Sequence, residues 1–310
     1  MINQYEPLTD GELKLANEIC YHLSQRIWTS PKETRFVHYT SWESAKSIIA
    51  GKTLWLSDLL CMADKSELVE GAYALKECLK TVTSTESDER SAMATDNLMT
   101  AAEEVVSYPT AGIHVLSMTS GCDSKRHWLD YACAESGIAL ELRVGDAFVK
   151  SLPVGVGYAT LAQVQYLESG KRDMMNQLAA AVQYVYGGGI PQPPRLSRER
   201  WINVLAYSIS RLFLAAVALT KTPSHAWEKE TRLLVMPEVS SVVPRPGGRA
   251  DYDRPILALR LGQELNLTKV CFRVPPCSSL RYRSLELLRR DSGLDFEIEG
   301  LNGHYCPDRP

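Results

Sequence analysis

The sequence has no apolar run long enough to cross a membrane. Its longest uninterrupted apolar stretch is LFLAAVAL at residues 212–219, far short of the roughly 20 residues that a bilayer requires. The N-terminal segment MINQYEPLTD has no basic region followed by an apolar core, so no secretory signal is predicted. We therefore expect a cytoplasmic protein with no membrane partner.

Paired cysteines with metal-ligand spacing are also missing. The chain has eight cysteines, and the closest two, Cys271 and Cys277, are not set in a ligand pattern. In a chain of 310 residues without a secretory signal, free thiols are the simplest interpretation. We expect neither a disulfide framework nor a bound metal.

The sequence has little excess charge and no glycine-rich phosphate loop. The net charge of -3 and the pI near 6.1 give no general attraction for nucleic acid or for an anionic membrane. The segment YGGGIP at residues 186–191 runs into proline rather than into a helix, so we interpret it as a linker. With 45% apolar and 23% charged residues, the composition is that of an ordinary globular protein.

Helical and extended patterns alternate along the chain without a strict βαβ rhythm, which predicts an α+β fold. Residues 9–28 predict a helix that begins at a capping box formed by Thr9 and Glu12. A second capping box, Thr40 with Glu43, predicts another helix that ends at a left-handed Gly51. An apolar stripe marks the buried face of the first helix: Leu15, Ile19, Leu23 and Ile27.

The remaining segments follow the same periodicities. Further helices are predicted near residues 65–80, 91–107, 170–185, 198–220 and 278–290. Strands are predicted near residues 35–40, 52–58, 112–120, 137–144, 160–167, 231–237, 254–261, 267–274 and 294–300. We expect an N-terminal helical extension over residues 1–34, followed by one α+β domain over residues 35–310.

The segment HAWEKETRLLV at residues 225–235 combines a buried strand with regularly spaced charges. Glu228, Glu230 and Arg232 fall at alternate positions, which share one face in an extended chain. The apolar residues 233–235 indicate that this strand is buried, and a buried lone charge is costly. We expect the carboxylates to face a polar cavity, with the arginine holding one of them as an anion. An ion pair on an exposed edge strand is the alternative.

Other polar groups lie at the ends of predicted strands. His38, Tyr39 and Thr40 occupy a strand-to-helix junction, where functional residues are often found, and Ser57 ends the next strand. The simpler interpretation is a histidine bonded to a backbone carbonyl, a packed tyrosine and a helix cap.

Further along, Ser117 lies on a strand, and Trp128 and Tyr131 would share one face of a helix. The two aromatic side chains predict either core packing or a wall for a flat ring.

Taken in order, several segments resemble a bacterial family known as domain of unknown function 2971. They are HYTSWESAKSIIAGKTLWLSD, MADKSELVEG, LSMTSGCDSKRHWLDYA with SGIALELR, HAWEKETRLL, LTKVCFRVPPCSSLRYRSLELLRR and LDFEIEGLNGHY. The resemblance covers residues 35–305. It departs from the family at residues 63–65, where Ala-Asp-Lys stands in place of the family's usual Asn-Asp-Pro.

That family is similar in turn to ADP-ribosyltransferases, which bind NAD in a cleft between two small sheets. The resemblance implies a split β-sheet core with added helices, and NAD as the substrate. It places a histidine on the first strand (His38), a serine on a middle strand (Ser57 or Ser117) and a Glu-x-Glu pair on a late strand (Glu228 and Glu230).

The resemblance also implies roles for these residues. Glu230 would stabilise the cationic ribose, and Glu228 would orient the acceptor or take its proton. The remaining residues would bind the dinucleotide: His38, Tyr39, Thr40, Ser57, Ser117, Trp128, Tyr131 and Arg232.

The acceptor would be a protein or nucleic acid, and the resemblance to this family suggests a role in toxin action or phage defence. Two alternatives stay open. The first is a nucleotide-binding or interaction module without catalysis. The second is a nucleic-acid-processing enzyme, which four arginines on and near the long helix of residues 198–220 suggest: Arg195, Arg198, Arg200 and Arg211.

Overall fold

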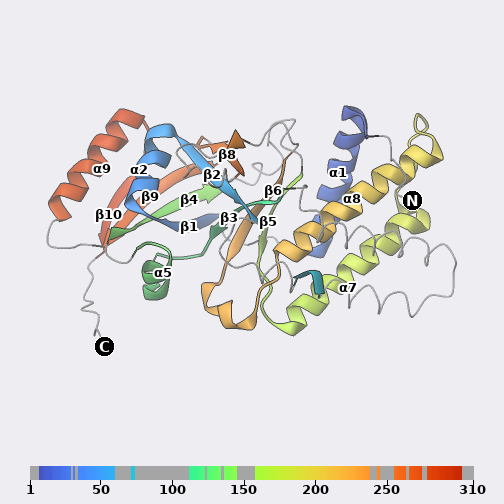
Figure 1. Cartoon of the computed structure of the whole chain (residues 1–310), viewed down its shortest axis with the longest axis horizontal. Coiled ribbons are helices and arrows are strands. Elements are labelled where there is room, and N and C mark those ends of the chain that lie inside the picture. Colours follow the sequence, from blue (N-terminus) through green and yellow to red (C-terminus); the bar gives the residue numbers. More distant parts are fainter. Residues whose placement is uncertain are drawn as a thin grey trace.

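The chain has a mixed α and β architecture with two sheets, which is compatible with the predicted α+β class (Figure 1). The computed structural model describes residues 7–28, 31, 34–59, 71–73, 112–122, 124–133, 136–144, 158–237, 243–244, 255–262, 265–273 and 278–301. The helices predicted near residues 65–80 and 91–107 lie outside this range, apart from residues 71–73, which are helical.

The helices are α1 (Asp10–Ile27), α2 (Trp42–Gly51), α5 (Lys125–Asp130), α7 (Glu168–Tyr184), α8 (Arg198–Ala218) and α9 (Ser278–Ser292), with the π-helical η3 (Val185–Gly189) and the 3-10 helix η4 (Pro223–Glu228). The strands are β1 (Arg35–Thr40), β2 (Thr53–Asp58), β3 (His114–Met118), β4 (Ile138–Val144), β5 (Tyr158–Gln163), β6 (Thr231–Met236), β7 (Val243–Pro244), β8 (Pro255–Arg260), β9 (Leu265–Arg273) and β10 (Glu297–Leu301).

The smaller sheet has the order β1-β4-β9-β10, and the larger sheet has the order β5-β6-β3-β2-β8-β7. All neighbouring strands are antiparallel except β9 and β10. The sheets are joined where β1 meets the end of β3. There the amide of Val37 donates to Thr119 O at 2.7 Å, and the amide of Thr119 donates to Val37 O at 2.9 Å.

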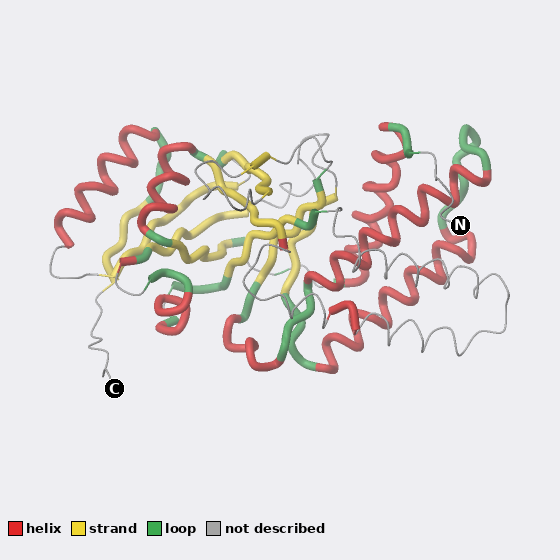
Figure 2. The backbone as a smooth tube through the Cα atoms, viewed as in Figure 1, coloured by secondary structure: helices red, strands yellow, loops and turns green. Residues whose placement is uncertain are grey.

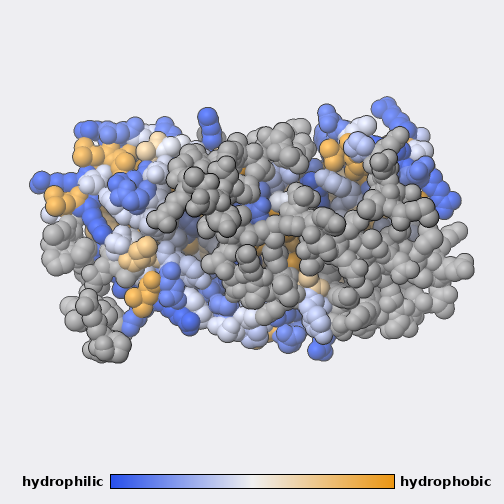
Figure 3. All heavy atoms as spheres, in the orientation of Figure 1, coloured by the Kyte–Doolittle hydropathy of each residue, from blue (hydrophilic) through white to orange (hydrophobic). Residues whose placement is uncertain are grey.

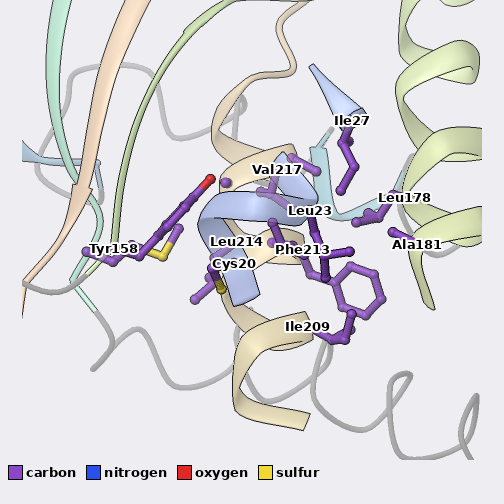
Figure 4. Packing of buried hydrophobic residues seen from close by; sticks show 14 of the residues in the cluster. Cys20, Leu23, Ile27, Tyr158, Leu178, Ala181, Ile209, Phe213, Leu214 and Val217 are labelled. Carbon is purple, nitrogen blue, oxygen red and sulfur yellow. The ribbon is translucent and has the colours of Figure 1, made fainter. Parts of the chain in front are cut away.

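The molecule is layered along its length. Helices α1, α7 and α8 form a layer at one end, beyond the larger sheet, and the strands are gathered in the rest of the molecule (Figure 2). Figure 4 shows part of the core between these helices and the sheet, where Cys20 and Leu23 of α1 lie beside Leu214 and Val217 of α8. A second core lies between the two sheets and is covered by α2 and α9.

Strand β6 is buried along its whole length. Leu234 and Met236 belong to the core beneath the helices, whereas Leu233 and Val235 belong to the core between the sheets. A strand with two apolar faces reads as a continuous apolar run, which explains why LLVM has no polar residue. The burial predicted for this strand is confirmed.

The capping box at the start of α1 is confirmed: Thr9 Oγ1 accepts from the amide of Glu12, and the carboxylate of Glu12 accepts from the amide of Thr9 at 2.8 Å. The second predicted box is wrong. The N-cap of α2 is Ser41, whose hydroxyl accepts from the amide of Ser44 at 3.1 Å. The left-handed residue after α2 is Lys52, with φ 49°, one position later than predicted.

Although its uninterrupted apolar run is short, α8 is the one described helix whose total length and mean hydropathy would allow it to cross a membrane. In this structure 72% of its most apolar window is buried, as in the core helix of a soluble protein. The described atoms on the face shown in Figure 3 are mostly hydrophilic, with apolar groups scattered among them. At the α9 end, the exposed apolar side chains include Leu280 and Leu287.

Candidate functional site

A cavity of about 160 Å³ opens where β1 of the smaller sheet meets β3 of the larger sheet. The segment from the end of α8 to the start of β6 and helix α5 complete its wall. Its lining residues are Val37, His38, Tyr39, Ser117, Met118, Thr119, His127, Tyr131, Lys221, Glu228 and Glu230.

The two predicted carboxylates, Glu228 and Glu230, both line this cavity. They are not on one strand, as the alternation had predicted. Glu228 ends the 3-10 helix η4, Lys229 adopts a left-handed conformation with φ 45°, and β6 begins at Thr231. The carboxylates converge on Lys221, whose Nζ lies 2.6 Å from Glu228 Oε2 and 3.2 Å from Glu230 Oε2.

Arg232 fixes Glu230 from the other side. Its Nε and Nη2 donate to the two carboxylate oxygens of Glu230 at 2.8 and 3.0 Å, and Nη1 donates to Ala218 O at 2.6 Å. Burial alone would raise the pKa of Glu230, but the charges of Arg232 and Lys221 hold it at about 2. The predicted role of the arginine as the partner of a carboxylate is therefore present, but Arg232 is fully buried and does not line the cavity.

A short segment after β5 sets the positions of Lys221 and Glu230. The amide of Lys221 donates to Gln165 O at 3.1 Å, the amide of Val164 donates to Glu230 O at 3.0 Å, and the amide of Glu230 donates to Tyr166 Oη at 2.9 Å. Gln165 and Thr220 form a parallel bridge, so the chain that leaves α8 runs beside this segment. Both charged groups are therefore held by backbone bonds.

Glu228 is held by three further groups. Tyr131 Oη donates to Glu228 Oε1 at 2.6 Å, and burial together with this carboxylate raises the pKa of Tyr131. The backbone carbonyl of Glu228 accepts from Thr119 Oγ1 at 3.1 Å and lies 3.1 Å from His127 Nε2. Glu228 therefore ties α5, β3 and the end of α8 together.

His38 and Ser117 come from different sheets and meet at the cavity. His38 Nδ1 lies 3.0 Å from Ser117 O, and because a carbonyl only accepts, Nδ1 carries the proton. Burial lowers the pKa of His38, so the neutral ring is favoured at neutral pH. The hydroxyl of Ser117 is buried and makes no hydrogen bond of normal geometry to a described residue, although it is close enough to Glu230 to favour the ionised carboxylate.

Besides Arg232, three of the predicted binding residues do not line the cavity. Thr40 is the last residue of β1 and faces Ile138, and Ser57 is an exposed residue of the inner strand β2. Trp128 is buried beneath the cavity, where its indole N–H donates to Cys122 O at 2.8 Å and its ring packs edge-on against Tyr39. Because none of them lines the cavity, Ser117 is the serine that meets His38 and Glu230.

Sequence reasoning missed Lys221 and His127, which both line the cavity. A lysine directly after the apolar end of α8 was the available signal for Lys221. His127 lies between Lys125 and Trp128 in the segment already singled out, and its ring stacks on Tyr39 with centroids 5.2 Å apart.

Among the described residues, no group of three or more His, Cys, Asp or Glu side chains is arranged to hold a metal ion. No family model, no curated protein and no solved structure matches the chain. The chemistry of the cavity is therefore argued from its own residues.

Proposed function

We propose that the protein is an NAD-dependent ADP-ribosyltransferase that modifies a macromolecular acceptor, a protein or a nucleic acid. The observation that carries the proposal is that His38 of the smaller sheet and Glu230, which directly precedes β6 of the larger sheet, line one cavity. This juxtaposition is what the resemblance to ADP-ribosyltransferases with a split β-sheet core requires. We further propose a cytoplasmic location, where NAD is available, with a role in toxin action or phage defence.

The electrostatics of Glu230 suit a developing positive charge. When the bond between nicotinamide and ribose breaks, the ribose becomes an oxocarbenium-like cation, and a preorganised anion lowers the energy of that state. With its pKa at about 2, Glu230 is ionised at neutral pH. It accepts three hydrogen bonds, from Arg232 and Lys221, out of about four that a carboxylate can accept, which leaves room for one ribose hydroxyl.

The cavity holds one end of the dinucleotide. Sites for whole ligands are typically about 300–1,000 Å³, and this cavity is about 160 Å³. We assign it to the nicotinamide ring and its ribose, with Tyr39 and His127 as the aromatic wall. The adenosine half would extend beyond the mouth of the cavity, and Glu228 would orient the acceptor or take its proton.

The neutralised charges favour one second candidate, a module that binds NAD without consuming it. Lys221 and Arg232 balance Glu228 and Glu230, so the resting site has no net charge from these four groups.

The alternative of a nucleic-acid-processing enzyme loses support, because two of the four arginines that suggested it are engaged in contacts within the protein. Arg200 pairs with Glu12, and Arg211 is buried and donates to Met236 O.

The test is incubation with labelled NAD and a cell extract, comparing the wild-type chain with Glu230→Gln. Transfer of label by the wild type, and its loss in the variant, supports the transferase. Glu12→Gln is the matched control, because Glu12 is also a carboxylate paired with an arginine but does not line the cavity. Equal labelling by wild type and Glu230→Gln would remove Glu230 from the mechanism. NAD binding without label transfer or nicotinamide release would favour the binding module.

A further inference from the structure

His127 presents one ring nitrogen whose chemistry is fixed by the fold. Its Nε2 lies 3.1 Å from the carbonyl oxygen of Glu228, and because a carbonyl only accepts, Nε2 carries the proton. Nδ1 of the neutral ring is then an acceptor only. This atom is buried and has no hydrogen-bond partner among the described residues.

The ring is also held in one orientation. It stacks on Tyr39 at an interplanar angle of 15° and packs against Trp227 at a centroid distance of 5.0 Å. Its backbone amide donates to the N-cap hydroxyl of Ser124 in the first turn of α5. Only 6% of the residue is exposed, and it lines the cavity beside Glu228.

A buried acceptor without a partner is costly, because it has lost its hydrogen bonds to water. A ligand that brings an N–H or O–H to Nδ1 removes this cost, whereas a carboxylate, which only accepts at neutral pH, cannot.

We propose that His127 is a specificity-determining residue that accepts a hydrogen bond from the carboxamide of the ligand and discriminates against the corresponding carboxylic acid. This inference rests on the proposed function, since it takes the nicotinamide end of NAD as the occupant of the cavity. It adds a selection between amide and acid that depends on one ring nitrogen.

Two substitutions separate this role from the structural role of the ring. His127→Gln can still donate to the Glu228 carbonyl, because the Gln amide nitrogen reaches the position of Nε2, but it has no acceptor at the position of Nδ1. His127→Asn keeps an acceptor near Nδ1 and loses the contact to the carbonyl. Affinities for nicotinamide and nicotinate, and for NAD and its nicotinic acid analogue, are measured by calorimetry in all three proteins.

We expect the wild type to prefer each amide over its acid by about tenfold or more. His127→Gln should lose that preference, and His127→Asn should keep it even if the protein is less stable. A purely structural histidine would give the reverse order, with Gln tolerated and Asn impaired. Nitrogen NMR of the full chain with labelled histidine gives an independent signal, because the Nδ1 resonance of His127 should shift when nicotinamide binds while Nε2 stays protonated.

The two proposals fail in different ways. Amide binding with an unchanged Nδ1 resonance and an unchanged preference in His127→Gln would overturn the role of His127 and leave the proposed function standing. If neither NAD nor nicotinamide binds the wild-type chain, the proposed function fails and the role of His127 fails with it.

Discussion

Lys221 and Glu228 form an ion pair of 2.6 Å between side chains that are only 6% and 4% exposed. Their charges are removed from water, so each depends on the other and on the few groups around them. Glu230, 3.2 Å from the same ammonium, shares this dependence. One lysine therefore pairs with two buried carboxylates.

Replacing Lys221 with Met should destabilise the protein by about 3–5 kcal/mol, because the two carboxylates lose their shared cation. The loss should be largest at neutral pH and smaller in acid, where Glu230 can take up a proton. Urea unfolding at several pH values measures it. Lys229→Met is the matched control, since Lys229 is exposed, and it should change stability little. Equal effects of the two substitutions would show that the cluster does not depend on Lys221.

The pKa of Glu230 predicts a pH dependence of stability. It is lowered from 4.5 to about 2, so the ionised carboxylate stabilises the folded state above pH 4.5, and this contribution is lost as the pH falls towards 2. The contribution at neutral pH is about 3 kcal/mol. The free energy of unfolding of Glu230→Gln should therefore fall less steeply in acid than that of the wild type.

Glu12 titrates in the same range, because its hydrogen bond and ion pair with Arg200 lower its pKa to about 2. Glu230→Gln alone, or Glu12→Gln alone, should therefore remove only part of the loss of stability in acid. If the free energy of unfolding of Glu230→Gln fell with pH in parallel with that of the wild type, the lowered pKa of Glu230 would be contradicted.

His38→Asn tests the contribution of β1 to ligand binding. The amide of Asn can replace the donation from Nδ1 to Ser117 O, but it removes Nε2, the ring nitrogen left for the ligand. We expect about tenfold weaker binding of NAD with little change in stability, measured by calorimetry and urea unfolding. His22→Asn, at an exposed position on α1, is the control. Unchanged NAD affinity in His38→Asn would exclude His38 from the binding site.

The start of α2 offers a test of the corrected cap. Ser41→Ala removes the hydroxyl that accepts from the amide of Ser44 and should cost about 1 kcal/mol. Thr40→Ala removes the residue that the sequence pattern suggested, and it should cost less. Urea unfolding of the two variants decides between the two positions. A larger loss of stability in Thr40→Ala than in Ser41→Ala would show that Thr40 is the cap.

Local patterns predicted most of the described elements. The stripe on α1 and the apolar run of β6 depend on neighbours within a few residues, and both lie as predicted. The spacing of Glu230 and Arg232 likewise indicated their pairing, because residues two apart on an extended chain share a face. The cap of α2 differs from the prediction because two adjacent residues, Thr40 and Ser41, can both cap a helix, and only Thr40 is followed by a glutamate at the third position.

The rest of the site depends on contacts between distant segments. Lys221 reaches the carboxylates because α8 ends beside residue 165, a parallel bridge that no local pattern encodes. The tautomer of His127 depends on a carbonyl 101 residues away along the chain. Glu228 keeps its place in the cavity although it lies outside β6, because the left-handed turn at Lys229 brings it back beside Glu230.

The reciprocal bonds between Val37 and Thr119 have a mechanical consequence. They join the two sheets in the wall of the cavity, so a bulky ligand cannot widen the cavity by separating the sheets there without breaking both bonds. Hydrogen exchange of these two amides therefore reports how often the sheets separate locally at the cavity. Their rate of exchange with deuterated solvent should slow when a ligand occupies the cavity, whereas amides in the middle of β6 should be unaffected.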